Sequence, residues 1–150
     1  DDATLARLDF VIGSVHSRFG LGEREMSARI LRALEHPALT ILGHPTGRLI
    51  GRRGGIHVDL ARVYAAAAQH GVMLEINAQP DRLDLDDLGA RAALERGAAL
   101  VISTDAHAVA ELGFMKWGVD QARRGWASRD RVANTRPLSK LLKLLHRGRR

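Results

Sequence analysis

The stretch Leu100-Val-Ile-Ser-Thr-Asp105-Ala-His107 is an apolar run that ends in an acid and a histidine. Two earlier apolar runs also end in histidine, Phe10-Val-Ile-Gly-Ser-Val-His16 and Leu39-Thr-Ile-Leu-Gly-His44. Short runs of Val, Ile and Leu between turn residues predict buried strands of a parallel sheet. The carboxyl ends of such strands meet at one edge of the sheet. The three runs therefore predict an α/β fold in which the histidines and Asp105 gather at that edge.

Strand and helix patterns alternate along the whole chain. Strands are expected at about 9–15, 39–43, 72–77 and 99–103, and helices at 26–35, 58–69, 85–96 and near 108–124. Pro37 ends the first helix because its ring removes a hydrogen-bond donor. Strands separated by such helices imply parallel pairing with right-handed crossovers. Four βα units of this kind predict part of a barrel or a doubly wound sheet, with two open edges and an uncovered apolar inner face.

The composition is that of an ordinary globular domain. The 150 residues are 45% hydrophobic and 27% charged, which favours one domain with a substantial core. No stretch is long enough to span a membrane and no signal peptide is recognisable, so we expect a cytoplasmic protein without membrane contact. Cysteine is absent, so a metal would have only nitrogen and oxygen ligands. The chain begins with Asp-Asp and no methionine, so we expect it to be a piece of a longer protein.

Positive charge is concentrated in two places. The net charge is +6, with one cluster at Arg48, Arg52 and Arg53 and a second in the tail, at Lys140, Lys143, Arg147, Arg149 and Arg150. This balance favours an anionic partner such as nucleic acid, and a solvated basic surface explains the charge equally well. The apolar spacing of 138–146 predicts a tail helix that packs on the body first and contacts phosphate second.

The strand-end histidines and Asp105 are candidate metal ligands. Asp105 and His107 are two residues apart, so their side chains can point the same way. Imidazole and carboxylate groups suit zinc, manganese or iron, whereas calcium and magnesium prefer oxygen alone. A metal held there lowers the pKa of bound water and holds anionic oxygens, as phosphoester hydrolysis requires.

Each candidate ligand also has a structural interpretation. His16 could be a hydrogen-bonded strand-end residue, His44 could shape a turn, and Asp105 could cap a helix. Three independent coincidences would be needed, which favours the ligand interpretation. Glu75 and Asn77 also lie at a strand end and could line the site, with a weaker signal. The remaining histidines are interpreted as surface residues: His36, His57, His70 and His146.

Four motifs carry a resemblance to a known family: Ser14-Val-His16-Ser, Gly43-His44-Pro-Thr-Gly-Arg48, Leu74-Glu75-Ile-Asn77-Ala and Ser103-Thr-Asp105-Ala-His107. They are similar to the later motifs of the polymerase-and-histidinol-phosphatase (PHP) family, and the resemblance covers nearly the whole chain. It is strongest to the PHP domain at the C-terminus of bacterial family X DNA polymerases, because of the Gly-Arg-Leu-Ile-Gly-Arg-Arg stretch at 47–53.

The resemblance implies that residues 1–150 are the C-terminal portion of a PHP domain, namely the last four βα units of a distorted (βα)7 TIM-like barrel. The complete domain would hold up to three divalent metals, Mn²⁺ or Zn²⁺, through nine ligands. His16 and His44 match ligands of one metal. Asp105 and His107 match ligands of the other two and would be the catalytic pair. The other five ligands, including an early His-x-His pair, lie outside this chain, so the isolated chain is expected to be inactive.

The activity that the resemblance implies is that of a metal-dependent phosphoesterase, a 3′–5′ exonuclease that acts on DNA 3′ ends in bacterial DNA repair. Its partners would be the polymerase domains of the same parent chain and the missing N-terminal half of the barrel. Arg48, Arg52 and Arg53 would contact substrate phosphates. Two alternatives stay open. One is a small-molecule phosphatase similar to histidinol phosphatases, and the other is a non-catalytic DNA-binding or structural module.

Overall fold

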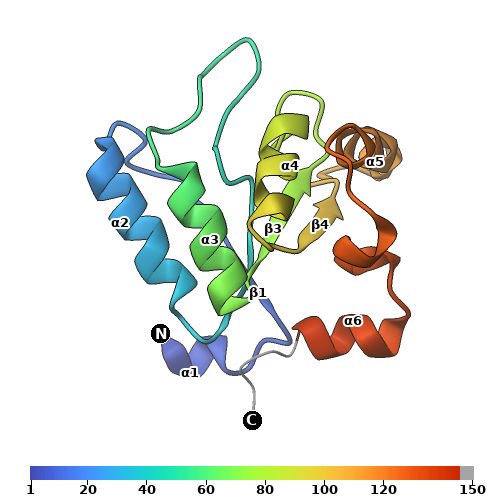
Figure 1. Ribbon diagram of the computed structural model, residues 1–150, viewed down its shortest axis with the longest axis horizontal. Coiled ribbons are helices and arrows are strands. Elements are labelled where there is room, and N and C mark those ends of the chain that lie inside the picture. Colours follow the sequence, from blue (N-terminus) through green and yellow to red (C-terminus); the bar gives the residue numbers. More distant parts are fainter. Residues whose placement is uncertain (146–150) are drawn as a thin grey trace.

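A computed structural model gives the fold of the chain and describes residues 1–145. Its strands form one parallel sheet in the order β1-β2-β3-β4, and helices alternate with them (Figure 1). This confirms the predicted α/β class with four parallel strands. The strands are β1 (Val11–Gly13), β2 (Leu39–Leu42), β3 (Met73–Asn77) and β4 (Leu100–Ser103). The helices are α1 (Asp2–Leu5), α2 (Glu23–Leu34), α3 (Leu60–His70), α4 (Asp87–Glu95), α5 (Met115–Arg124) and α6 (Leu138–Leu145), with 3₁₀ turns η1 (Val109–Phe114), η2 (Arg129–Arg131) and η3 (Ala133–Thr135).

The structure differs from the sequence prediction mainly at the ends of elements. The helix expected near 108–124 is divided, because Gly113 disfavours the α-helix and residues 109–114 wind as η1. The first strand is shorter than the predicted range 9–15. Within the described residues β1 has a neighbour on one side only, and its register with β2 shifts between Val11 and Ile12.

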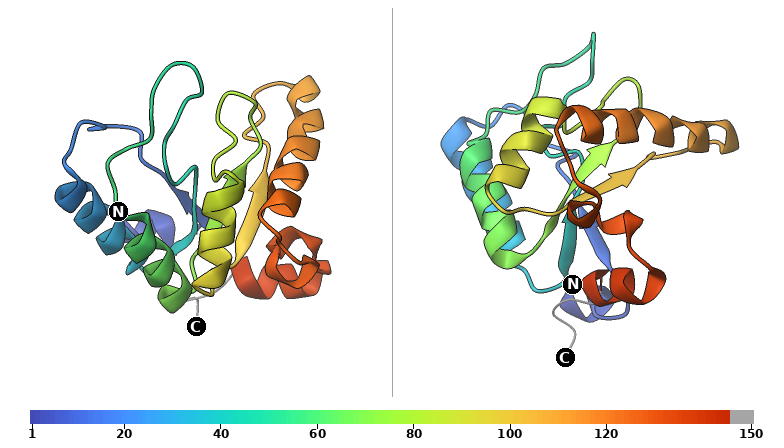
Figure 2. Two further views of the ribbon diagram at one scale, coloured as in Figure 1. Left: turned by 45° about the horizontal axis from the view of Figure 1, so that its top comes forward. Right: turned by 45° about the vertical axis from the view of Figure 1, so that its right-hand side comes forward.

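Helices α2, α3 and α4 cover one face of the sheet (Figure 2). Their apolar sides contribute Met26 and Val63 to one buried core that also contains Leu74, Ile76 and Leu100 of the strands. Alternate residues of a strand point to opposite faces, so these strand residues share the helical side. Burial of this apolar surface is the main favourable term in folding. No helix within residues 1–145 is long and apolar enough to cross a membrane.

The opposite face of the sheet changes character along the strands. At their amino-terminal ends, Ile41 and Met73 pack against leucines of α6, which Figure 2 shows on the side away from α2–α4. The tail helix therefore packs on the body as predicted, and an entirely uncovered inner face was a wrong expectation. At the carboxyl ends the same face carries the polar residues Glu75, Asn77 and Ser103. The predicted tail residues His146, Arg147, Arg149 and Arg150 lie outside the described part of the chain.

Two open sheet edges were predicted, and the structure covers one of them. Along β4, the Asn134 side chain donates from Nδ2 to the Ile102 carbonyl at 2.9 Å and accepts at Oδ1 from the Ile102 amide at 3.2 Å. Leu100 also forms a bridge with Val132. The β1 edge pairs with no further strand within residues 1–145, and Ile12 is 49% exposed there. The prediction is wrong for β4 because the segment after α5 folds back along it.

Candidate metal centre

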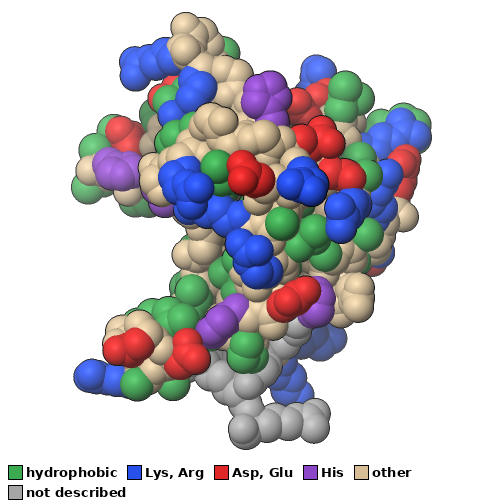
Figure 3. Space-filling model, turned by 90° about the vertical axis from the view of Figure 1, so that its left-hand side faces the viewer, with side chains coloured by type: hydrophobic (Ala, Val, Ile, Leu, Met, Phe, Trp, Pro, Cys, Tyr) green, Lys and Arg blue, Asp and Glu red, His purple; other side chains and the backbone are tan. Residues whose placement is uncertain are grey.

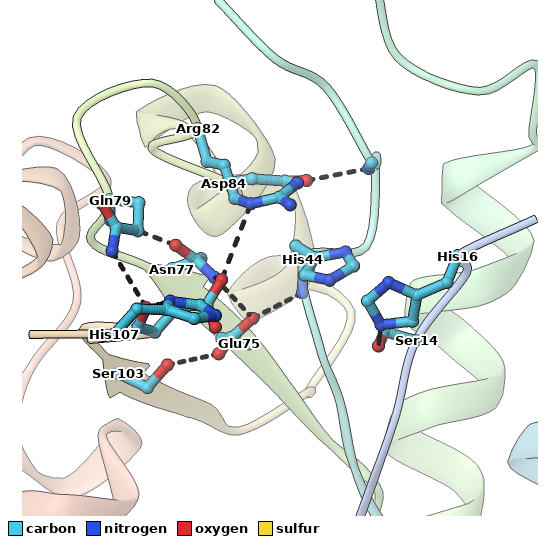
Figure 4. Close-up of polar contacts among 12 residues, drawn as sticks. Ser14, His16, His44, Glu75, Asn77, Gln79, Arg82, Asp84, Ser103 and His107 are labelled. Carbon is cyan, nitrogen blue, oxygen red and sulfur yellow. Dashed lines mark hydrogen bonds and ion pairs between the residues drawn. The ribbon is translucent and has the colours of Figure 1, made fainter.

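His16 and His44 follow neighbouring strands, and the structure brings them together. His16 lies three residues beyond the end of β1, and His44 lies two residues beyond the end of β2. Because β1 and β2 pair in parallel, both loops leave the same edge of the sheet. The ring centroids are 5.1 Å apart and the rings meet at 89°, edge to face (Figure 4). The Ser14 hydroxyl bonds to Nε2 of His16 at 2.6 Å, which leaves Nδ1 for another partner.

The backbone at His44 is held in an unusual conformation by Glu75. His44 has φ +29°, and its amide donates to Oε2 of Glu75 at 2.5 Å. The preceding residue is glycine for a steric reason. A Cβ atom on Gly43 would lie 3.1 Å from the Ile12 side chain and 3.4 Å from Glu75 Oε2. Close approach of the β2 end to Glu75 thus requires Gly43, and it sets the direction of the His44 ring.

The His44 ring is suited to bind a metal ion. His44 is 7% exposed, and its Nδ1 atom is buried without a hydrogen-bond partner. Burial lowers the pKa of His44, and the positive charge of Arg82 lowers it further. The neutral imidazole is the form that offers a lone pair to a metal. A buried nitrogen without a partner is costly unless it is satisfied by a ligand, so a divalent cation fits this donor.

Glu75 is the centre of a buried polar network. Glu75 and Asn77 are alternate residues of β3, so their side chains share the inner face of the sheet. Ser103, which pairs with Asn77 across β3 and β4, donates its hydroxyl to Oε1 of Glu75. Asn77 Nδ2 donates to Glu75 Oε2 at 3.4 Å. These contacts use both carboxylate oxygens, so Glu75 positions its neighbours from beneath the site. The sequence had suggested both β3 residues only as a weak signal.

Asp105 and His107 form a second pair beyond β4. Asp105 has φ +49°, and its Oδ2 accepts from Asn77 Nδ2 at 3.1 Å. The Asp105 carbonyl accepts from Nδ1 of His107 at 2.7 Å, so in the neutral ring Nε2 carries the lone pair. The His107 amide donates to Glu111 at 2.7 Å, and this bond lowers the pKa of the Glu111 carboxyl. Both candidate ligands therefore have fixed orientations at the rim.

The two pairs lie on either side of Glu75 and do not merge into one cluster. Figure 4 shows Glu75 between His44 and His107. Within residues 1–145 no group of three or more His, Asp or Glu side chains is gathered closely enough to hold a metal. Catalytic zinc sites have about three protein ligands. The structure therefore contains two half-sites, and metal ligation by His16, His44, Asp105 and His107 stays a prediction.

The arginines proposed as phosphate contacts have different surroundings. Arg48 donates to the Arg82 carbonyl at 2.7 Å, the Leu83 carbonyl at 2.5 Å and the Asp86 carboxylate at 2.8 Å. Arg53 donates to the Gly47 carbonyl at 2.9 Å and lies 3.8 Å above the Phe19 ring. Arg52 is exposed on the same loop. Arg48 and Arg53 thus make internal contacts that the sequence did not indicate, although Arg53 is exposed like Arg52.

Two residues of the loop after β3, Arg82 and Asp84, belong to the site although the sequence did not single them out. The guanidinium group of Arg82 lies inside the site. The Arg82 side chain is 19% exposed, and its Nε lies 3.6 Å from Oδ2 of Asp105. Its Nη1 atom is buried without a hydrogen-bond partner. An arginine that closely follows a strand end, in a loop beside the candidate ligands, was a signal that could have identified it. Arg82 is placed to meet an anion that approaches Asp105.

Asp84 is the second missed residue. It is completely buried, and its carboxylate accepts from the amides of Thr46 at 3.1 Å and Gly47 at 2.9 Å. Its backbone exchanges two hydrogen bonds with Asn77. Burial raises the pKa of Asp84 to about 6, although the amides favour its charged form. Asp84 therefore connects the loop that carries His44 to the end of β3.

Backbone strain is concentrated at this edge of the sheet. Non-glycine residues rarely adopt positive φ, and such residues often mark functional sites. Within residues 1–145 the non-glycine residues with positive φ are Arg18, His44, Leu83, Asp105 and Trp126. Two of them are candidate ligands, and two others lie in the loops that follow β1 and β3. The observed conformations agree with a site at the carboxyl ends of the strands.

Comparison with known proteins places the chain near DNA-processing and phosphatase enzymes. No protein-family model matches it. It is 43% identical over 148 residues to the DNA polymerase/3′-5′ exonuclease PolX of Bacillus subtilis (strain 168), covering 99% of this chain and 26% of PolX. It is 28% identical over 144 residues to a probable phosphatase of Thermoanaerobacter sp. (strain X514), covering 89% of this chain and 56% of that protein. It is 27% identical over 154 residues to a probable phosphatase of Shewanella sp. (strain ANA-3), covering 96% of this chain and 58% of that protein.

The chain spans about a quarter of PolX and little more than half of these two probable phosphatases. It is therefore similar to a segment of PolX and to a larger part of the phosphatases. These relatives support a phosphoesterase-like or PolX-related function for the α/β sheet and its polar rim.

Proposed function

We propose that this chain is the C-terminal part of a PHP-type metal-dependent phosphoesterase, and that its parent protein is a 3′–5′ exonuclease of the family X polymerase kind. The observation that carries the proposal is the edge-to-face pair of His16 and His44, with a buried and unpartnered nitrogen on His44. The 43% identity with PolX over almost the whole chain supports the DNA-processing branch. On this proposal the four βα units belong to a (βα)7 barrel, and the parent acts on DNA in the bacterial cytoplasm.

The proposed chemistry assigns a role to each residue at the rim. Divalent Mn²⁺ or Zn²⁺ ions would be held by His16 and His44, by Asp105 and by His107, and would lower the pKa of water and neutralise phosphate oxygens. Glu75 holds the His44 backbone in place through its amide. The carbonyl of Asp105 fixes the His107 tautomer.

Arg82 is the residue that would meet the substrate phosphate directly. It approaches Asp105 and retains an unpartnered guanidinium nitrogen, and arginine matches phosphate oxygens in geometry and charge. Arg52, exposed on the loop after β2, would contact a phosphate further along the strand. Arg48 and Arg53 would hold these loops in shape.

Metal titration of the 150-residue chain tests the proposal. Two imidazoles supply fewer ligands than a closed site, so we expect weak binding of Zn²⁺, in the micromolar range or looser. Isothermal titration should show that His16→Ala and His44→Ala each abolish this binding. His57→Ala is the matched control, because His57 is an exposed histidine that is not a member of the pair. Zn²⁺ binding that persists in each of these two variants would show that the histidines are not ligands. Phosphoesterase activity from the chain alone would contradict the division into half-sites.

A small-molecule phosphatase is the second candidate function. It is favoured by the two probable phosphatases, of which the chain covers 56% and 58%, a larger share than of PolX. The parent protein distinguishes the two functions. Release of mononucleotides from a labelled DNA 3′ end supports the exonuclease, whereas release of phosphate from histidinol phosphate without DNA degradation supports the phosphatase.

A further inference from the structure

A basic groove runs along α2 and the loop that precedes it. It has a volume of about 580 Å³ and is lined by Arg18, Leu21, Arg24, Glu25, Ala28, Arg29 and Arg32. Figure 3 looks onto this side of the molecule and shows Lys and Arg side chains gathered across its middle. Four guanidinium groups and one carboxylate line the groove, so its net charge is strongly positive.

The arginines of the groove are not neutralised by the protein. Within the described part of the chain, four arginines outside the groove do form ion pairs with carboxylates, among them Arg91 with Glu95 and Arg124 with Asp87. Arg29 has Glu25 one helical turn before it, a spacing that favours an ion pair. It instead donates to the Ser17 carbonyl at 2.8 Å, in the loop after β1. No ion pair within residues 1–145 involves any of the four groove arginines.

The groove is continuous in sequence and in structure with the His16 half-site. Arg18 follows His16 by two residues in the loop between β1 and α2. The bond from Arg29 to Ser17 ties this loop to the helix, so the position of Arg18 is fixed relative to the rest of the groove. An α-helix rises about 1.5 Å per residue, so Arg24 and Arg32 lie about 12 Å apart along α2. A single small anion would not span this length, whereas consecutive phosphates of a strand would.

We propose that the groove formed by Arg18, Arg24, Arg29 and Arg32 binds the phosphate backbone of a nucleic-acid strand that extends from the histidine pair along α2. The proposal rests on the phosphoesterase function proposed above and adds the direction that its substrate takes. Arginine binds phosphates through paired N–H groups, and such contacts hold a strand without reading its bases. The groove is thus a contact surface for single-stranded DNA and is separate from the exposed loop of Arg52.

Fluorescence anisotropy with a fluorescein-labelled oligothymidylate tests the groove directly. The variant is Arg24→Ala combined with Arg32→Ala, because neither side chain has a hydrogen bond or ion pair within residues 1–145 whose loss would destabilise the fold. We expect at least about tenfold weaker binding, and a slope of log K against log salt that is smaller by about 1.4, since each single-strand phosphate contact contributes about 0.7. Circular dichroism verifies that the helix content is unchanged.

Two comparisons make the result specific. Arg123→Ala with Arg129→Ala removes the same charge from α5 and η2, and it should change the affinity less than about threefold, since distant charges are screened. Arg24→Lys with Arg32→Lys keeps the charge and should retain the salt slope. Equal weakening by both alanine pairs would show that only net charge matters, which overturns the groove as a site. Unchanged binding in the groove variant, or binding to phosphatidylserine vesicles without binding to the oligonucleotide, would also overturn it.

Zn²⁺ titration of the same groove variant separates this inference from the proposed function. Its His16 and His44 residues are unaltered, so metal binding should equal that of the native chain. Normal metal binding with no effect on the oligonucleotide leaves the proposed function standing and removes the groove. Absence of metal binding in the native chain would contradict the proposed function, whatever the groove does.

Discussion

The Asp105 carboxylate takes part in contacts within the protein and is also a proposed metal ligand. Its Oδ2 accepts a hydrogen bond from Asn77 and faces the Arg82 guanidinium, and it is also the only carboxylate among the four proposed ligands. A neutral amide of the same size would lose the charge that attracts both a metal and Arg82. Replacing Asp105 by Asn therefore tests the role of its charge while the shape of the side chain is kept.

We predict that Asp105→Asn in an intact parent protein lowers exonuclease activity by about a hundredfold or more, because a metal ligand loses its charge. Folding should be retained, since the side-chain volume hardly changes. The measurement is nucleotide release from 3′-labelled DNA in the presence of Mn²⁺. Asp120→Asn, at an exposed position on α5, is the control and should keep full activity. Full activity of the Asp105 variant at saturating Mn²⁺ would mean that Asp105 is not a ligand.

A second prediction at the residue scale concerns Asp84 and the pH dependence of stability. Its pKa is raised from 3.8 to about 6 in the folded chain because the carboxyl is buried. The folded state therefore holds this proton more tightly than the unfolded state. Stability from this group is present below pH 4 and is lost as the pH rises through about 6. The full difference is on the order of 3 kcal/mol.

The comparison of native chain and Asp84→Asn isolates this effect. His44, whose pKa is lowered, acts in the opposite sense, and it is present in both proteins, so the comparison reports mainly the Asp84 contribution. As the pH falls from 7 to about 5, we expect the free energy of unfolding of the native chain to increase relative to that of the variant. Urea denaturation at both pH values measures it. A difference that does not change with pH would refute the raised pKa.

The packing of α5 on the sheet decides where the loop with Asp105 and His107 is held. Gly118 is the contact point, since a Cβ atom there would lie 2.4 Å from the Ile102 side chain and 3.0 Å from that of Ala78. Helix α5 can approach β3 and β4 this closely only because residue 118 has no side chain.

At the scale of this element we predict that Gly118→Ala destabilises the chain by about 1–3 kcal/mol, because the added methyl group overpacks the contact. Gly113→Ala is the matched control. It lies just before α5 with nothing within 4 Å of the position of its Cβ atom, so it should be neutral or slightly stabilising. Urea unfolding of both variants gives the comparison. Equal effects would show that α5 does not depend on this close contact.

At the scale of the whole molecule, the free edge of β1 determines how the chain behaves alone. Ile12 is exposed on β1, Leu8 and Phe10 are exposed just before it, and β1 pairs only with β2 within residues 1–145. An unpaired strand with apolar side chains invites pairing with another chain. On the proposed function, the N-terminal half of the barrel covers this edge in the parent protein.

We therefore predict that the isolated chain self-associates as its concentration rises, and that Ile12→Lys reduces this association by placing a charge on the edge. Leu88→Lys is the control, because Leu88 is 75% exposed but lies on α4, away from the edge. Sedimentation velocity over a range of concentrations measures the effect. A chain that stays a monodisperse monomer over the whole concentration range would contradict both the prediction and the need for a covering half.

The sequence by itself determined the parallel α/β architecture, the placing of His16, His44 and Asp105 just beyond strand ends, and the packing of the tail helix. These features follow from local patterns, since apolar runs, helix periods and turn residues act over a few neighbouring positions. Only the tertiary structure decided that Asn134 covers the β4 edge, that Arg48 and Arg53 bond to backbone carbonyls, and that Arg82 and Asp84 reach the site. These contacts join residues far apart in the chain, and no local pattern specifies which distant partner a polar side chain meets when it leaves water.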